Sequence, residues 1–122
     1  MTDNIHTDLF SEDITLVLSM FNNEPRRIIL AILLTRKKYT FTQLEQAVKN
    51  VNISKQNLSH HLKKLEESGL LENILMKDEN SKFYSYYQIT DYGYDLIDYI
   101  NKFESFTKKA MDDKGLDEVA TE

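Results

Sequence analysis

Residues 52–71 read NISKQNLSHHLKKLEESGLL, and they carry the strongest structural signal in the chain. Ser54 is a residue type that caps the first turn of helices, and Gly69 is typical of the left-handed position just past a helix end. Between them, apolar residues recur at helical spacing on one face. These are Leu58, Leu62 and Leu65. The segment therefore predicts a capped helix with one apolar side and one polar side.

A shorter helix is predicted immediately before it. Thr40 followed by Gln43 fits a capping box, in which each side chain bonds the other residue's backbone N–H at a helix start. Residues 49–52 then form a tight connection to the longer helix. Two helices joined in this way, the second capped at both ends, form a helix-turn-helix pattern.

After the longer helix, the period of the sequence changes to that of a strand. Residues 71–76 alternate between two faces, and the aromatic-rich segment 82–89 favours a second strand beyond the polar cluster at 77–81. Together they predict a β-hairpin. Three side chains of its second strand share one face: Phe83, Tyr87 and Ile89.

Helices are also predicted on both sides of this body. An apolar stripe indicates a helix from about Thr7 to Phe21, and residues 25–35 form a helix that is apolar nearly all round, as expected at the centre of a core. The final helix, about Asp91 to Met111, carries apolar residues spaced four and three apart, as in a coiled coil. Thr90 is its expected cap.

The stripe on the first helix and the seam on the last are more apolar surface than one small domain can cover, which predicts a homodimer. The expected interface residues are Phe10, Ile14 and Val17 on the first helix and Tyr92, Leu96, Tyr99, Ile100, Phe103 and Phe106 on the last. Packing of these two helices on each other within one chain is the alternative.

The predicted fold class is mainly α with a small β-hairpin wing, a winged helix-turn-helix between two dimerisation helices. The segments are an N-terminal dimerisation helix in 1–24, the winged domain over 25–89, a coiled-coil-like helix over 90–111 and an acidic, frayed tail over 112–122.

The charge of the chain is unevenly distributed. Its formal net charge is −5, which on its face argues against a nucleic-acid partner. However, residues 1–25 carry −5 and residues 110–122 carry −4, so that residues 26–109 carry +4. A basic body can present a basic face, and we expect the acidic ends to lie at the dimer side, away from a duplex.

Other classes of protein are disfavoured. The longest apolar run, Ile28 to Leu34, is far shorter than the ~20 residues that span a bilayer, and the polar, acidic start lacks a signal-peptide pattern. We expect a cytoplasmic, nucleoid-associated protein with no membrane partner. The sequence has no Gly-rich phosphate loop, nucleophile elbow or spaced metal motif, so we predict neither enzymatic activity nor a cofactor.

The polar side of the capped helix suits double-stranded DNA. Gln can pair bidentately with adenine, Ser and His can bond several base edges, and Lys suits phosphates. A merely solvated helix face is the alternative interpretation. The predicted DNA-binding residues of this helix are Ser54, Lys55, Gln56, Asn57, Ser59, His60, Lys63 and Lys64.

Residues 53–71 resemble the recognition-helix signature of the ArsR family of winged-helix repressors, Ser-x-x-x-Leu/Val-Ser-x-His-Leu-x-x-Leu-x-x-x-Gly-Leu. The matching residues are Ser54, Leu58, Ser59, His61, Leu62, Leu65, Gly69 and Leu70. MarR-type regulators share parts of the pattern. The resemblance extends over about residues 25–106, and the long last helix and aromatic wing are also similar to small archaeal Lrs-like regulators, including biofilm regulators.

The chain departs from this family in its metal ligands. Metal-sensing ArsR members use a Cys pair beside the recognition helix, or His and Asp on the last helix. This chain has no cysteine and no histidine after His61, and the side chains of His60 and His61 point about 100° apart on a helix. We predict no metal site. His61 is expected to be a core or cap-bonding residue, and His6 to be inert.

The hairpin is predicted to contact the minor groove or the flanking backbone. Lys77, Lys82 and Tyr84 are its expected DNA contacts, although Asp78 and Glu79 at the same tip weaken them, and a solvated turn is the alternative. Phosphorylation of Tyr84 or Ser85 would add about 1.5–2 negative charges and release DNA by repulsion. The alternative for this hydroxyl cluster is ordinary strand packing.

The leading interpretation is a homodimeric transcription regulator that reads DNA sequence. The alternatives are an architectural DNA-binding protein of low sequence specificity and a winged-helix protein-interaction module. The sequence indicates no effector ligand.

Overall fold

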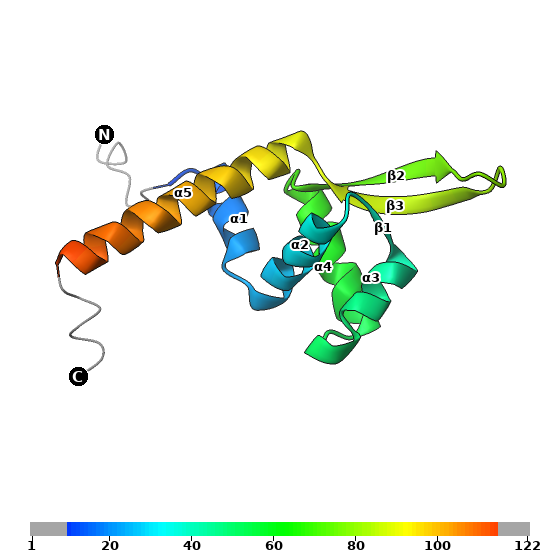
Figure 1. Ribbon diagram of the computed structural model, residues 1–122, viewed down its shortest axis with the longest axis horizontal. Helices are drawn as coiled ribbons and strands as arrows, with labels where there is room; N and C mark the ends of the chain where they lie inside the picture. The colour runs from blue at the N-terminus through cyan, green and yellow to red at the C-terminus, as the bar shows by residue number, and fades with distance from the viewer. Residues whose placement is uncertain (1–9, 115–122) are drawn as a thin grey trace, which may run out of the picture. The chain divides into compact units, whose positions relative to one another are not determined.

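The computed structural model describes residues 10–114, and the chain divides after Thr90 into two compact units (Figure 1). The first unit contains, in chain order, α1 (Glu12–Phe21), α2 (Glu24–Thr35), β1 (Tyr39–Thr40), α3 (Phe41–Ala47), the 3-10 helix η2 (Lys49–Val51), α4 (Lys55–Glu67), β2 (Leu71–Lys77) and β3 (Phe83–Ile89). The second unit contains α5 (Asp91–Asp113). The predicted fold class, mainly helical with a small antiparallel wing, is confirmed.

The core of the first unit lies where α2, α3 and α4 pack together against the base of the sheet. Its apolar side chains are almost completely buried, and they are Met20, Ile29, Leu30, Leu33, Leu44, Val48, Leu58, Leu62, Leu65, Leu70, Leu71 and Ile89. The expectation that α2 is central holds for one side only. Leu34 on the other side is 47% exposed, so this helix is buried along a stripe rather than all round.

Helix α1 begins later than the sequence predicts. The backbone N–H of Ile14 donates to Oγ of Ser11, which makes Ser11 the cap and Glu12 the first helical residue. Phe10 therefore precedes the helix, and the predicted start at Thr7 lies outside the described residues. The stripe expected on this helix thus loses its first member.

The predicted capping box is confirmed at the start of α3. The Gln43 backbone N–H donates to Thr40 Oγ1 over 3.1 Å, and the Thr40 N–H donates to Gln43 Oε1 over 2.9 Å. The connection to α4 turns at Asn52, whose φ of 60° lies in the left-handed region that Asn tolerates better than most residues. These local interactions set the angle between α3 and α4.

Both predicted ends of α4 are also confirmed. Ser54 Oγ accepts the N–H of Asn57 over 3.1 Å at the start. At the end, Gly69 has a φ of 85° and the N–H of Leu70 donates to the carbonyl of Leu65, which is a Schellman motif. The cap and the glycine explain why the helix stops where the hairpin must begin.

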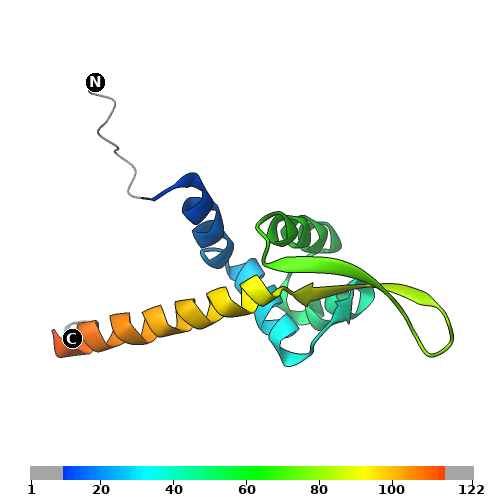
Figure 2. The ribbon, with the colours of Figure 1, turned by 90° about the horizontal axis from the view of Figure 1, so that it is seen from above.

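The hairpin forms as predicted, and the sheet gains a third strand. The strand order is β1-β3-β2, all antiparallel. Register pairs Leu71 with Ile89 at the base and Lys77 with Phe83 beside the turn. Sequence analysis missed β1 because two residues are too short for a periodic pattern. Both ribbon views show the hairpin extending well past the helices of its unit (Figures 1 and 2).

The described part of the second unit contains one helix, α5. It ends at Asp113 rather than at the predicted Met111. Large aromatic side chains on its seam are exposed, with Tyr99 at 67%, Phe103 at 67% and Phe106 at 73%. An exposed pair of Asp98 and Lys102, 3.0 Å apart at i,i+4 spacing, supports the helix. The hydrogen bond to Asp98 raises the pKa of Lys102.

Candidate nucleic-acid interface

The two sides of α4 differ as the sequence predicts. Its leucines are at most 1% exposed, whereas the polar side chains of its first three turns are accessible. At 3.6 residues per turn, Gln56, Ser59, His60 and Lys63 lie within about 100° of one another, opposite the leucines. The exposed members of the predicted set are Ser54, Lys55, Gln56, Asn57, Ser59, His60 and Lys63. The structure therefore gathers four of the eight predicted residues, Gln56, Ser59, His60 and Lys63, on one accessible helix face.

The two adjacent lysines of α4 are not equivalent. Lys63 is exposed on the polar face beside Gln56. Lys64 is half-buried at the border of that face, and its Nζ lies 3.8 Å from a carboxylate oxygen of Glu67. Because an exposed pair of this kind contributes little to stability, its main effect is to offset the charge of Lys64.

His61 lies on the border between the buried and exposed sides of α4. Its Nδ1 accepts a hydrogen bond of 3.1 Å from Nε of Arg26 on α2. Burial, the nearby guanidinium and His60 together lower the pKa of His61, so the neutral ring is favoured. The sequence predicted a core or cap-bonding role for His61. The structure instead gives a partly buried ring that bonds the Arg26 side chain, a partner that the sequence did not indicate.

Arg26 also connects α4 to α1. Its Nη1 donates to the carbonyl of Ser19 over 3.4 Å and lies 3.8 Å from Sδ of Met20. The backbone N–H of Arg26 donates to Asn23 Oδ1 at the α2 cap. One guanidinium thereby links three helices, and it holds the polar face of α4 in position relative to α1.

The tip of the hairpin is a turn organised by Asp78. Oδ1 of Asp78 accepts the backbone N–H groups of Asn80 and Lys82 over 2.9 and 2.8 Å, and Ser81 adopts a φ of 64°. The acidic residue predicted to weaken the tip thus has a structural role. Lys77 and Lys82 are exposed on either side of this turn, as the prediction requires.

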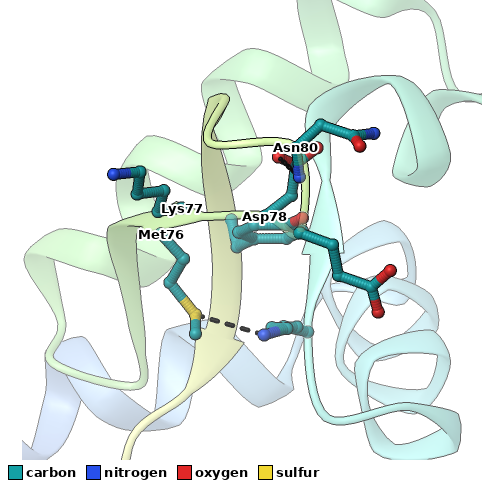
Figure 3. A pocket seen from close by; sticks show the side chains of 7 residues that line it. Met76, Lys77, Asp78 and Asn80 are labelled. Atoms are coloured by element: carbon teal, nitrogen blue, oxygen red, sulfur yellow. Dashed lines mark hydrogen bonds between the residues drawn. The ribbon is translucent and has the colours of Figure 1, made fainter.

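One face of the hairpin is held by a residue that sequence analysis did not select. Nζ of Lys38, from the loop before β1, lies 4.9 Å from the ring centroid of Tyr86 and donates to Sδ of Met76 over 3.2 Å (Figure 3). These side chains and the tip line a shallow cavity of about 420 Å³. A lone Lys in a loop gives no periodic signal, so only the fold reveals this contact.

The predicted modification sites are accessible. Tyr84 is 41% exposed and its ring centroid lies 6.4 Å from that of Tyr86 on the same face. Ser85 is exposed on the other face, where its Oγ donates to Oδ1 of Asn73 over 2.6 Å. The two hydroxyls therefore point to opposite sides of the hairpin and do not form one cluster.

Residues 10–114 contain neither a cluster of metal ligands nor a membrane-spanning helix. No group of three or more His, Asp or Glu side chains in this range is placed to hold a metal ion. None of the described helices is long and apolar enough to cross a membrane.

Known proteins resemble this chain in sequence and in fold. The helix-turn-helix domain family matches residues 23–74, which contain α2 through most of β2. The smu.1704 protein of Streptococcus mutans UA159 is 30% identical, with 75% of this chain and 83% of that chain covered at a TM-score of 0.51. Residues 23–74 therefore carry a helix-turn-helix domain within the winged fold described above.

More distant structures share the fold. A putative transcriptional regulator of the MarR family from Enterococcus faecalis V583 is 18% identical, covers 90% of this chain and 98% of its own, and has a TM-score of 0.64. The diamide-treated YodB of B. subtilis is 16% identical, covers 84% and 96%, and has a TM-score of 0.67. No curated protein matches the chain significantly. The chain thus shares its fold with these proteins over most of its length.

Proposed function

We propose that this winged helix-turn-helix regulator is a homodimer that reads a DNA sequence by inserting α4 into the major groove, while the hairpin contacts the flanking backbone or minor groove. It acts by binding rather than by catalysis, and its place is the cytoplasm, on the nucleoid. Double-stranded DNA and a second copy of the chain are its partners.

The observation that carries this proposal is the accessible polar face of α4. Gln56, Ser59 and His60 supply donors and acceptors for base edges, and Lys63 supplies a charge for phosphate. None of these four side chains takes part in the core, to which α4 contributes its three leucines. Both ends of α4 are capped within the chain, so the face is presented in a fixed orientation.

The distribution of charge supports the same conclusion. Residues 26–109, which form most of the winged body and of α5, carry a net charge of +4 despite the negative total. Residues 1–25 and 110–122 are acidic, and we place them on the side of the dimer away from the duplex. There they would limit binding to unrelated polyanions.

The exposed aromatic seam of α5 supports dimerisation. Phe103 and Phe106 expose more than two-thirds of their surface, and burying one such ring in an interface contributes about 1.5–3 kcal/mol. Ile14 and Val17 on α1, with Phe10 before it, extend this proposed interface. A two-fold dimer would set two copies of α4 about 34–36 Å apart and would match a pseudo-palindromic site.

Selection of bound sequences from random DNA, followed by gel shifts on the selected duplex, tests the proposal. We expect the double change Gln56→Ala with Lys63→Glu to weaken binding by at least about a hundredfold, because it removes a base contact and reverses a phosphate contact. Lys108→Glu is the control. It makes the same charge reversal on the side of α5 away from the aromatic seam, and it should change binding little.

The outcomes separate this function from its alternatives. Selection that enriches no sequence, with a steep salt dependence, would indicate an architectural DNA-binding protein. A parent protein that shifts no duplex would indicate a protein-interaction module instead. Equal binding by the parent and the double variant would contradict the role of α4.

A further inference from the structure

Two large apolar side chains stand exposed on the outer half of the hairpin. Leu75 is 67% exposed and Phe83 is 61% exposed. Register pairs Leu75 with Ser85 and Phe83 with Lys77, so both side chains project from the same face of the two-stranded ribbon. Neither contributes to the core of the unit.

This face is the one that packs on the helices at the base of the hairpin. Leu71 and Ile89, which belong to it by alternation, are buried in the core. Tyr87, one step farther out, is close enough to α4 that Glu66, together with burial, raises its pKa. Leu75 and Phe83 continue the face beyond the helices, on the side of the sheet where α4 lies.

Two lysines flank the pair, in a turn that also carries Asp78 and Glu79. Nζ of Lys77 lies 5.7 Å from the centroid of the Phe83 ring, and Lys82 directly precedes Phe83 at the turn. The carboxylate of Asp78 is engaged by two backbone N–H groups of the turn. Between Asn73 and Tyr87, no acidic residue belongs to this face of either strand.

The small size of the exposed pair, Leu75 and Phe83, distinguishes between a protein partner and a DNA partner. A stable protein interface buries about 800 Å² on each partner, which two side chains cannot supply. A minor-groove wedge needs only one or two apolar side chains, flanked by cations that hold the phosphates on each side of the groove. Lys77 and Lys82 beside Phe83 provide that combination.

We propose that Phe83, backed by Leu75, is an apolar wedge that enters the DNA minor groove beside the site read by α4, partly unstacks a base step and bends the duplex. The inference rests on the proposed DNA-binding function and adds a distinct activity to it, which is DNA deformation. Sequence preference at the flanks would then come from the ease of unstacking, and flexible pyrimidine–purine steps would be favoured.

The test measures bending and affinity together, with the full chain and a duplex selected by it from random DNA. The duplex carries a fluorescence donor and acceptor at its ends, so that bending raises energy transfer. We expect Phe83→Ala to abolish most of the bend and to weaken binding about tenfold, with an unchanged salt slope because no charge is altered. Phe83→Leu should retain most of the bend.

Met76→Ala is the matched control. Met76 is an apolar residue of the same hairpin, it is also exposed, and it projects from the face opposite to Phe83. Its change should leave the bend intact. Equal loss of bending in both variants would indicate general damage to the hairpin and would overturn the wedge.

Failure of the wedge can be told apart from failure of the proposed function. A parent protein that binds its selected duplex and leaves it straight overturns the wedge alone, as does a Phe83→Ala variant that bends DNA like the parent. A parent that binds no duplex overturns the proposed function, and with it the wedge. Bending that depends on Phe83 supports both.

Discussion

Helices α4 and α5 are both amphipathic, but the apolar side of α4 is buried and that of α5 is exposed. The three leucines of α4 are at most 1% exposed, whereas Tyr99, Phe103 and Phe106 of α5 are each at least 67% exposed. Helix α4 is covered by α2, α3 and the sheet of its own unit. Equal periodicity therefore predicts a helix in both cases, but it does not identify what covers the apolar side of that helix.

The largest expected effect concerns α5. We expect Phe103→Glu combined with Phe106→Glu to convert a dimer into a monomer at micromolar concentration, because two charges would be buried in the interface. Light scattering measures the mass, and far-ultraviolet circular dichroism should show retained helix. Asn101→Glu with Ser105→Glu, on the other side of α5, is the control and should remain dimeric.

Two results would contradict a dimer formed through the aromatic side of α5. If the parent chain is already a monomer at these concentrations, the aromatic side of α5 does not mediate dimerisation. If both double variants dissociate equally, the effect comes from added charge rather than from the seam.

The next effect concerns the buried side of α4. We expect Leu62→Ala to lower the free energy of unfolding by about 3 kcal/mol, because it leaves a cavity where a side chain is 1% exposed. Urea unfolding, in the Phe103→Glu/Phe106→Glu background to avoid coupled dissociation, provides the measurement. Leu34→Ala on the exposed side of α2 should cost less than half as much, and equal costs would contradict the assigned core.

The smallest effect concerns His61, at the border between the two sides of α4. Its pKa is lowered in the folded chain, so the unfolded state binds more protons as the pH falls below about 6.5. This contribution to stability is complete above that pH and is lost as the pH falls through the lowered pKa. We expect His61→Asn, which keeps an acceptor for Arg26, to flatten the urea-unfolding profile between pH 7.5 and 5. An unchanged slope would contradict this assignment.

The sequence predicted best those features that depend on neighbouring residues. The capping box at Thr40 and Gln43, the cap at Ser54 and the left-handed Gly69 are each fixed within a few positions, and the structure confirms all of them. The hairpin, and the assignment of its residues to one face or the other, followed from the alternation of neighbouring residues for the same reason. The polar face of α4 followed from the spacing of its leucines.

Most of the features that the sequence missed depend on residues distant in the chain. Strand β1 exists because Tyr39 and Thr40 pair with β3, and Arg26 bonds His61 across 35 positions. Lys38 reaches the hairpin in the same way. The late start of α1 is a different case, because Ser11 competes with the apolar stripe as the signal for the helix start, and the local cap prevails.

The caps at the two ends of α4 have a thermodynamic consequence. Ser54 and Gly69 order the first and last turns in the free protein, and Arg26 clamps the middle of the helix through His61. In the proposed complex, association with a duplex would therefore require little loss of conformational entropy in this element, unlike a segment that folds as it binds. Preorganisation of this kind leaves the free energy of each base contact available for discrimination between sequences, and it should show as a small heat-capacity change from the helix itself.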